Sequence, residues 1–202
     1  MGGAAAPEDL TLDLVLVRHA STAWSRSHRH TGRTDLPLDE AGRGEARSLA
    51  RRLAGLEPAR VLVSPLRRAR ETCELAGFGE RAEVLDDLAE WDYGEYEGRR
   101  ASEVRAERDG WDLFRDGCPG GEALADVAVR AERVLAVIGH GSGGPPVLVF
   151  SHGHLLRVLA ACFLGWPPAT GRQLLLDAGA LGLLGTERGV RVLRSWNVDR
   201  LA

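Results

Sequence analysis

The sequence predicts an α/β fold, a three-layer α/β/α sandwich built on a mostly parallel sheet. Three apolar runs, at residues 14–17, 61–63 and 147–150, show no polar alternation, which is typical of strands buried on both faces. Segments with helical periodicity separate these runs, as in βαβ units. The 202 residues suit one domain. We expect a flexible N-terminal tail at 1–10 and a single domain at 11–202.

The elements are expected in a definite order. A strand near 12–17 precedes a long polar loop at 18–38, and Asp39 then caps a helix that runs to about Ala54. The strand at 61–63 leads into a helix that ends near Ala76, with Ser64 as its N-cap and Pro65 in its first turn. The remaining expectations are a short strand at 84–85, an acidic loop at 86–98, helices at 102–108, 111–114 and 122–138, a loop at 139–146, a strand at 147–150, a helix at 154–164, and strands at 174–176, 180–184 and 190–196.

Composition excludes several classes of partner. The formal net charge of -3 provides no electrostatic footprint for nucleic acid or for an anionic membrane. Neither a signal peptide nor an apolar run of membrane-spanning length is visible. The cysteines, Cys73, Cys118 and Cys162, match no zinc or redox spacing, which favours reduced thiols. We therefore expect a cytoplasmic protein that binds neither nucleic acid nor membrane.

Polar side chains follow each of the three buried strands at the same relative place. Arg18 and His19 follow the first strand, Arg68 lies shortly after the second, and His152 follows the third. Ligands of open α/β sheets bind just beyond the carboxyl ends of the strands. If the strands are parallel neighbours, these side chains converge on one pocket.

The segments that carry these residues resemble the motifs of the histidine phosphatase superfamily, which includes phosphoglycerate mutases and many acid phosphatases. The first segment, Arg18-His19-Ala20-Ser21-Thr22, resembles the family signature. Four further pieces follow in the family's order: Thr31-Gly32, Ser64 to Thr72, Leu88 to Gly94 with Glu97-Gly98, and Ser151-His152-Gly153. Each string is common by itself, but all five in order are highly specific. The resemblance implies a phosphoglycerate mutase-like sandwich.

The resemblance also assigns roles, and each role makes chemical sense. His19 corresponds to the nucleophile, because a neutral imidazole can attack phosphorus and form a phosphohistidine. Arg18, Arg68 and a protonated His152 would hold the phosphoryl group together with His19, as forked or charged donors suit its spread negative charge. Glu90 corresponds to the acid that protonates the leaving alkoxide. Two arginines and an imidazolium neutralise the charge, so we expect no metal and no cofactor.

Further residues are expected around the substrate. The candidate substrate-binding residues are Ser25, Thr31, Gly32, Tyr93 and Gly153. His28 and His30 are expected at the rim of the site or on the surface, and His154 at the start of a helix. Arg29, Arg33, Arg99 and Arg100 are extra cations that would either bind a second anionic group or lie exposed. The family's usual glycine after Arg-His is Ala20 here, which would be strained if that backbone needed a positive φ.

The expected activity is the hydrolysis of small phosphate esters such as sugar phosphates. The mutases carry a long basic insert and a lysine after the Glu loop, whereas the interval from Glu90 to His152 is short and contains no lysine. The residues most resemble the branch of acid phosphatases and sugar bisphosphatases. The alternatives are a phosphoglycerate mutase, a metal hydrolase built on His28, His30, His152 and His154, and a non-catalytic phospholigand-binding module. A homodimer is the candidate assembly, and the expected pH optimum is acidic to neutral.

Overall fold

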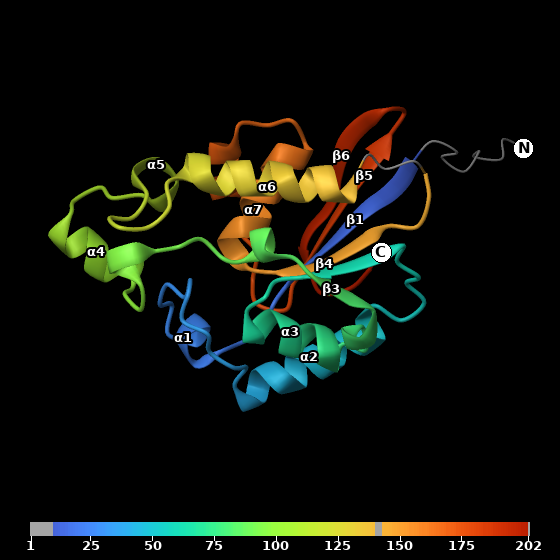
Figure 1. Cartoon of the computed structure of the whole chain (residues 1–202), viewed down its shortest axis with the longest axis horizontal. Coiled ribbons are helices and arrows are strands. Elements are labelled where there is room, and N and C mark those ends of the chain that lie inside the picture. Colours follow the sequence, from blue (N-terminus) through green and yellow to red (C-terminus); the bar gives the residue numbers. More distant parts are fainter. Residues whose placement is uncertain (1–9, 140–142, 202) are drawn as a thin grey trace, which may run out of the picture.

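The computed structural model describes residues 10–139 and 143–201, in which a six-stranded sheet has the order β3-β2-β4-β1-β5-β6 (Figure 1). Strands β1, β2, β3 and β4 are paired in parallel, whereas β5 pairs antiparallel with β1 and β6 pairs antiparallel with β5. The strands are β1 (Leu10–Arg18), β2 (Arg60–Val63), β3 (Ala82–Val84), β4 (Val147–Ser151), β5 (Leu181–Glu187) and β6 (Val190–Val198). This arrangement confirms the predicted α/β sandwich with a mostly parallel sheet.

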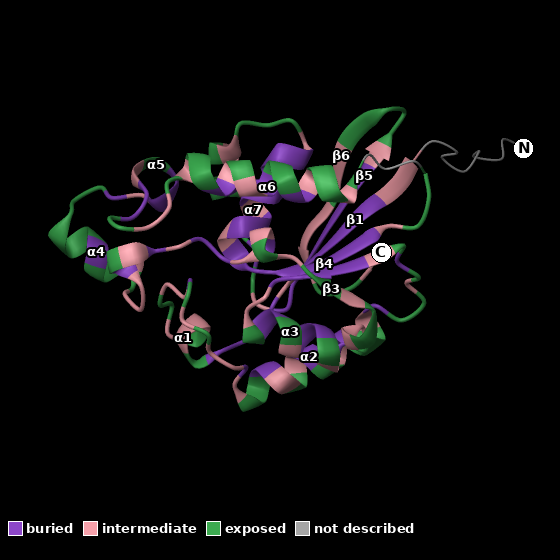
Figure 2. Ribbon diagram, in the orientation of Figure 1, coloured by how far each residue is buried: buried purple, intermediate pink, exposed green. Residues whose placement is uncertain are grey.

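Helices cover both faces of the sheet. Helices α2 (Glu40–Arg52) and α3 (Arg67–Leu75) lie on one face, and α6 (Leu124–Ile138) and α7 (Gly153–Phe163) lie on the other (Figure 1). Side chains of β1 alternate between the layers: Leu14 and Leu16 join the core with α6 and α7, whereas Val15 and Val17 join the core with α2 and α3. The strands at the centre are therefore buried on both sides (Figure 2).

Shorter elements complete the fold. They are the helices α1 (Ala23–Arg26), α4 (Ala101–Glu107) and α5 (Leu113–Asp116), and the 3-10 helices η1 (Gly79–Arg81), η2 (Asp86–Leu88), η3 (Gly94–Tyr96) and η4 (Pro168–Gln173). The Asp39 cap is confirmed, because its carboxylate accepts from the Gly42 N–H at 2.7 Å. Among the described residues, no helix is long and apolar enough to cross a bilayer.

Three predictions about these elements were wrong. Ser64 does not cap α3, which begins at Arg67 after a Leu66 N-cap, because the Ser64 hydroxyl bonds instead to His152. Residues 174–176 form no strand, and the Leu176 carbonyl accepts from Arg18. The polar loop at 18–38 contains the short helix α1.

Other boundaries shift by a few residues. Strand β3 ends where the strand at 84–85 was expected to begin, α5 starts two residues late, and α6 starts at Leu124 rather than 122. Leu10, expected in the tail, opens β1, and the rest of that tail lies outside the described residues. So do residues 140–142 of the expected loop at 139–146.

The carboxyl ends of three strands meet at one edge. Arg18 of β1 lies opposite Ser151 of β4, and Phe150 of β4 lies opposite Val63 of β2. The segments that follow β1, β2 and β4 therefore start side by side, as the sequence predicts for parallel neighbours.

Candidate active site

His19 lies directly beyond β1 and is held there through its backbone and its ring. Its N–H donates to the Ser151 carbonyl at 2.9 Å, and its Nδ1 lies 2.8 Å from the Ala20 carbonyl. A carbonyl can only accept, so Nδ1 carries the proton and Nε2 keeps its lone pair. Burial, together with the charges of Arg68 and Arg18, lowers the pKa of His19 well below its usual value. The imidazole is thus neutral and presents a free Nε2.

Arg18 lies beside His19 against the N-terminus of α7. One of its Nη atoms donates to the Leu176 carbonyl at 2.6 Å, while its buried Nε has no hydrogen-bond partner among the described residues. A Cβ on Gly153 would lie 3.2 Å from that Nε and 3.3 Å from Cζ. Glycine at this position therefore leaves room for the guanidinium group.

Arg68, in the first turn of α3, is completely buried. Its guanidinium donates to the carbonyl oxygens of Thr31, Gly32 and Thr34 at 2.8–3.1 Å, which ties α3 to the loop after α1. Burial lowers the pKa of Arg68, although an arginine stays charged. Its Nε has no partner among residues 10–139 and 143–201.

His152, the N-cap residue of α7, lies behind His19. The two ring centroids are 5.2 Å apart, and the His152 Nε2 lies 2.7 Å from the Ser64 hydroxyl. Burial and the charge of Arg68 lower the pKa of His152 well below its usual value. The lowered pKa disfavours the imidazolium form that the expected role of His152 requires.

Three buried nitrogens around His19 lack hydrogen-bond partners within the described part of the chain: Arg18 Nε, Arg68 Nε and His152 Nδ1. Buried polar atoms are rarely left unpaired, and each such atom requires an explanation. Three of them in one cluster, two carrying positive charge, suit a small oxyanion such as a phosphoryl group. Arg18, Arg68 and His152, which are predicted to hold phosphate, thus each have a buried nitrogen without a partner within the described residues.

Glu90 lies at the N-terminus of α7 and is only 8 % exposed. Its carboxylate accepts from the backbone N–H groups of Trp91, His154 and Leu155 at 2.9–3.1 Å. Two of these donors are among the first N–H groups of α7, which have no partner within a helix. Glu90 therefore satisfies the helix end that the His152 side chain does not cap.

Arg130 of α6 holds the segment that carries Glu90. Its guanidinium donates to the carbonyl oxygens of Asp87 and Ala89 at 2.8 Å and of Glu90 at 3.3 Å. It also pairs with Glu122 at 2.7 Å. The sequence did not single out Arg130, because it lies in an ordinary alternation of acids and arginines on a helix.

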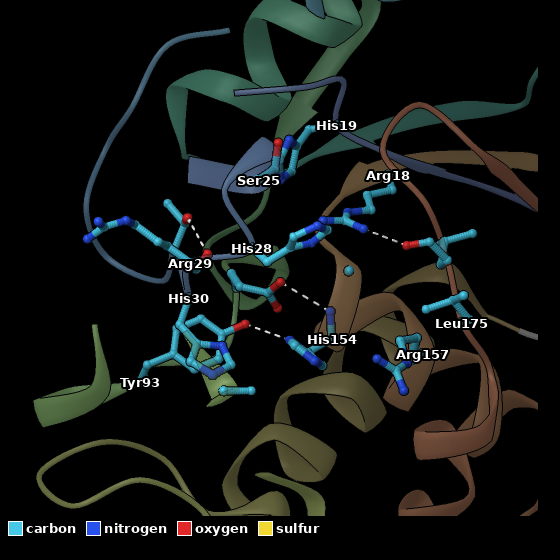
Figure 3. A pocket seen from close by; sticks show the side chains of 15 residues that line it. Arg18, His19, Ser25, His28, Arg29, His30, Tyr93, His154, Arg157 and Leu175 are labelled. Atoms are coloured by element: carbon cyan, nitrogen blue, oxygen red, sulfur yellow. Dashed lines mark hydrogen bonds between the residues drawn. The ribbon is translucent and has the colours of Figure 1, made fainter. Parts of the chain in front are cut away.

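A pocket of about 410 Å³ opens beside His19 and Arg18 (Figure 3). Of the predicted substrate-binding residues, Ser25, Thr31, Tyr93 and Gly153 line it, as does Glu90. The remaining lining residues are His28, Arg29, His30, Ala101, His154, Arg157, Leu175 and Leu176. Arg68 and His152 are fully buried and lie outside this lining.

Two predicted substrate-binding residues have other partners. The Gly32 N–H donates to the Glu97 carboxylate at 2.9–3.0 Å, and Gly32 is absent from the pocket lining. The Ser25 hydroxyl bonds the backbone of Thr22 at 2.8–3.0 Å in a capping box, although Ser25 still faces the pocket. Ala20 does not have a positive φ, so it is not strained.

The extra arginines divide into two groups. Arg33, Arg99 and Arg100 pair with Asp92, Glu107 and Glu103 respectively, and none of the three lines the pocket. Arg29 does line it.

Two residues that the sequence did not assign to the site, His154 and Arg157, also line the pocket. His154 Nδ1 lies 2.6 Å from the Tyr93 hydroxyl. Nothing in the local sequence marks either residue beyond its spacing from His152 along α7.

The metal-hydrolase alternative finds no geometric support. Within residues 10–139 and 143–201, no three His, Cys, Asp or Glu side chains gather as metal ligands do. His152 is directed to Ser64, and His154 to Tyr93.

Comparison with known proteins agrees with this geometry. The family model of the histidine phosphatase superfamily (branch 1) matches residues 14–199, which include all five motifs. The chain belongs to the histidine phosphatase superfamily. Its relatives include an acid phosphatase of Mycobacterium tuberculosis, 39% identical over 183 residues, which cover 89% of this chain and 89% of the relative.

Two further comparisons extend this result. The sedoheptulose 1,7-bisphosphatase of Saccharomyces cerevisiae is 37% identical over 186 residues, covering 77% of this chain and 69% of the relative. A solved structure of an open reading frame from Mycobacterium tuberculosis superimposes with a TM-score of 0.86 at 37% identity, covering 95% of this chain and 98% of that one. The family and its phosphatase members identify this chain as a phosphatase.

Proposed function

We propose that this protein is a metal-independent phosphomonoesterase that hydrolyses small phosphate esters such as sugar phosphates through a phosphohistidine on His19. The observation that carries the proposal is the unpaired Nε2 of a neutral imidazole, with two buried, unpartnered arginine Nε atoms around it. The acid phosphatase and sugar bisphosphatase relatives support the substrate class.

In the first step, His19 Nε2 attacks phosphorus and the bond to the ester oxygen breaks. Arg18, Arg68 and His152 Nδ1 donate to the equatorial oxygens, where charge is spread in the transition state. A neutral His152 can serve in this role when the Ser64 hydroxyl donates to its Nε2, because its proton then resides on Nδ1. Protonated Glu90 gives its proton to the leaving alkoxide.

In the second step, water enters from the pocket and attacks the phosphohistidine. Glu90, now a carboxylate, takes a proton from this water, the bond between phosphorus and Nε2 breaks, and inorganic phosphate leaves. The three backbone N–H groups around Glu90 stabilise the carboxylate between the two steps.

Hydrolysis of p-nitrophenyl phosphate tests the proposal. His19→Ala should lower kcat/KM at least about a thousandfold, because the nucleophile is lost. Arg68→Ala should also lower it strongly, whereas Arg70→Ala, an exposed control on the same helix, should not. Quenching with alkaline denaturant during turnover should trap a phosphoenzyme that is stable to alkali and labile to acid.

Two results would contradict the proposal. Equal rates for wild type and His19→Ala would exclude the nucleophile, and loss of activity with a chelator would restore the metal-hydrolase alternative. A coupled assay with 3-phosphoglycerate and a bisphosphate primer separates hydrolysis from the mutase alternative, for which phosphoryl transfer would exceed phosphate release.

A further inference from the structure

His28 has a backbone conformation that side chains rarely adopt. Its φ is 55°, in the left-handed region where Cβ crowds the neighbouring carbonyl. Two other non-glycine residues in the described chain, Arg188 and Asn197, share this region, and neither lines the pocket. Unfavourable backbones persist only where the surrounding structure imposes them, and they cluster at binding sites.

Hydrogen bonds on both sides of His28 impose its conformation. Before it, the Ser27 carbonyl accepts from Arg100 Nε at 2.9 Å. After it, the His30 N–H donates to the Arg99 carbonyl at 2.9 Å. The chain is thus fixed at both ends of a short turn, and the imidazole of His28 is presented from a rigid base.

This rigid turn lies along the pocket. Figure 3 shows His28 and His30 on one side of the pocket, with Arg157 and Leu175 on the opposite side. His28 is exposed, so its ring is accessible to a substrate.

His30, on the same side of the pocket as His28, also has a polar atom that is free to bind a substrate. Its ring stacks on Tyr93 with the centroids 4.6 Å apart, and its buried Nε2 has no hydrogen-bond partner within the described residues. Burial lowers the pKa of His30 to about 4, so the ring is neutral at pH 7. A neutral imidazole offers one donor and one acceptor, which suits a hydroxyl group better than an anion.

Four further groups that line the pocket can hydrogen-bond without a charge, namely Ser25, Thr31, Tyr93 and His154. The charged lining residues are Arg18, Arg29, Glu90 and Arg157, of which Arg29 lies between the two histidines in the chain. Arg18 lies at the His19 end, where the phosphoryl group is expected. The remaining part of the pocket therefore faces the alcohol portion of a phosphate ester.

We propose that His28 and His30 form a specificity wall that hydrogen-bonds hydroxyl groups on the alcohol portion of the substrate. The pocket then prefers phosphate esters of polyols to alkyl phosphates of the same length. This inference rests on the proposed function in one respect, because it places the phosphoryl group beside His19.

Binding of D-ribitol 5-phosphate and n-pentyl phosphate tests the wall, because both have five carbons but only the first carries free hydroxyls. Dissociation constants are measured by calorimetry in the His19→Ala background, in which both esters should bind without turnover. We expect ribitol 5-phosphate to bind more tightly. The affinity ratio is the affinity for ribitol 5-phosphate divided by that for n-pentyl phosphate. His28→Gly and His30→Phe should each reduce this ratio by about threefold to tenfold, because each variant loses one or two neutral hydrogen bonds to the substrate.

The variants are chosen to separate binding from stability. His28→Gly removes the imidazole from a backbone that glycine adopts freely, and His30→Phe keeps the aromatic stacking on Tyr93. Arg188→Gly is the matched control, because Arg188 has a φ of 49° in the turn between β5 and β6. It should leave the affinity ratio unchanged, and neither glycine variant should lower Tm.

Folded His28→Gly and His30→Phe proteins with the wild-type affinity ratio would overturn the proposal. So would an equal drop in the Arg188→Gly control. These outcomes are independent of turnover. Failure of the hydrolytic mechanism would appear separately, as undiminished p-nitrophenyl phosphate hydrolysis by His19→Ala.

Discussion

Burial sets the charge of His19, and with it the pH range in which its imidazole can act as a nucleophile. An imidazole in water would be half protonated near pH 6.5, which would block attack on phosphorus. Burial first, and then the charges of Arg68 and Arg18, hold the pKa of His19 well below that value. The same positive charges that are proposed to bind phosphate thus disfavour protonation of the candidate nucleophile.

We therefore expect the acid limb of the kcat/KM profile to lie below pH 6.5. The nucleophile remains neutral in mildly acidic buffer, while Glu90 must be protonated to act as an acid, so activity should be highest at acidic to neutral pH. Hydrolysis of p-nitrophenyl phosphate from pH 3.5 to 9 measures the profile. An acid limb at or above pH 6.5, or a rate that rises steadily above pH 8, would contradict this prediction.

The guanidinium of Arg130 anchors the backbone next to Glu90. In the proposed mechanism it would act as a positioning residue, because it holds three carbonyl oxygens of the segment that carries Glu90. Arg130→Met should lower kcat about tenfold to a hundredfold, since small displacements of a catalytic group are costly. It should also lower the free energy of unfolding by about 1–3 kcal/mol, because the partly buried Glu122 carboxylate loses its charged partner and keeps only the Asp92 N–H as a donor among the described residues.

Arg133→Met provides the control for Arg130. Arg133 lies one turn further along α6 and pairs with Asp87 at an exposed position. Its loss should change neither kcat nor the unfolding midpoint measurably. Arg130→Lys separates the two roles. If Arg130 is only structural, kcat of this variant should recover as far as its stability does. If Arg130 positions Glu90, the forked guanidinium is required, and kcat should stay low even where stability recovers.

At the scale of elements, the N-terminus of α2 packs directly on the segment that follows His19. A Cβ on Gly42 would lie 2.0 Å from the Ser21 carbonyl oxygen, so this glycine allows a close approach between helix and loop. The Glu45 carboxylate, one turn further on, accepts from both the N–H and the hydroxyl of Ser21 at 2.9–3.0 Å. Helix α2 therefore fixes the backbone behind the candidate nucleophile.

Gly42→Ala should lower the free energy of unfolding by about 1–3 kcal/mol, because the methyl group forces α2 and the Ser21 backbone apart. Gly44→Ala is a matched change on the same helix, where a Cβ meets nothing within 4 Å. It should raise stability by about 0.5–1 kcal/mol through helix propensity. Urea denaturation of both variants measures the difference, and equal effects would refute the close contact.

The sequence was enough to predict which elements carry the candidate site, but not which hydrogen bonds their side chains form. Strand ends and family motifs were sufficient to bring Arg18, His19 and His152 together, because parallel strands share an edge. Ser64 was misassigned as a cap because a distant partner, His152, takes its hydroxyl. No local pattern could reveal such a tertiary hydrogen bond, and the same holds for the carbonyl partners of Arg130.

The partners of the acidic residue Glu97 were likewise not predictable from the sequence. The sequence predicts only an acidic loop at 86–98, yet Glu97 in that loop accepts from the backbone N–H groups of Gly32 and Thr34. Those two residues in turn supply carbonyl partners to Arg68. Periodicity marks which face of an element is apolar, but it does not indicate which backbone groups a carboxylate will satisfy.

The buried imidazoles link the stability of the protein to pH. Burial is the largest cause that lowers the pKa values of His19, His30, His152 and His154. Below pH 6.5 the unfolded chain binds protons at these positions while the folded chain does not. The free energy of unfolding therefore falls with decreasing pH, down to the folded-state pKa of each histidine, which is about 4 for His30.

Each such histidine contributes a slope of up to about 1.4 kcal/mol per pH unit. Urea denaturation at pH 7.5, 6 and 5 should show the loss, and His30→Phe should reduce the slope by one such contribution. Stability that does not change between pH 7.5 and 5 would show that these rings bind protons equally in the folded and unfolded states.

The place of β1 in the sheet has a consequence for biosynthesis. This strand carries the Arg-His pair at its end, yet its two neighbours, β4 and β5, come from residues 147–151 and 181–187. A ribosome that has made only the first hundred residues has therefore exposed His19, the candidate nucleophile, without either flanking strand. Nascent chains should remain inert toward cellular metabolites until β4 and β5 have been translated, and release of inorganic phosphate by stalled ribosomal complexes of increasing length would reveal this threshold.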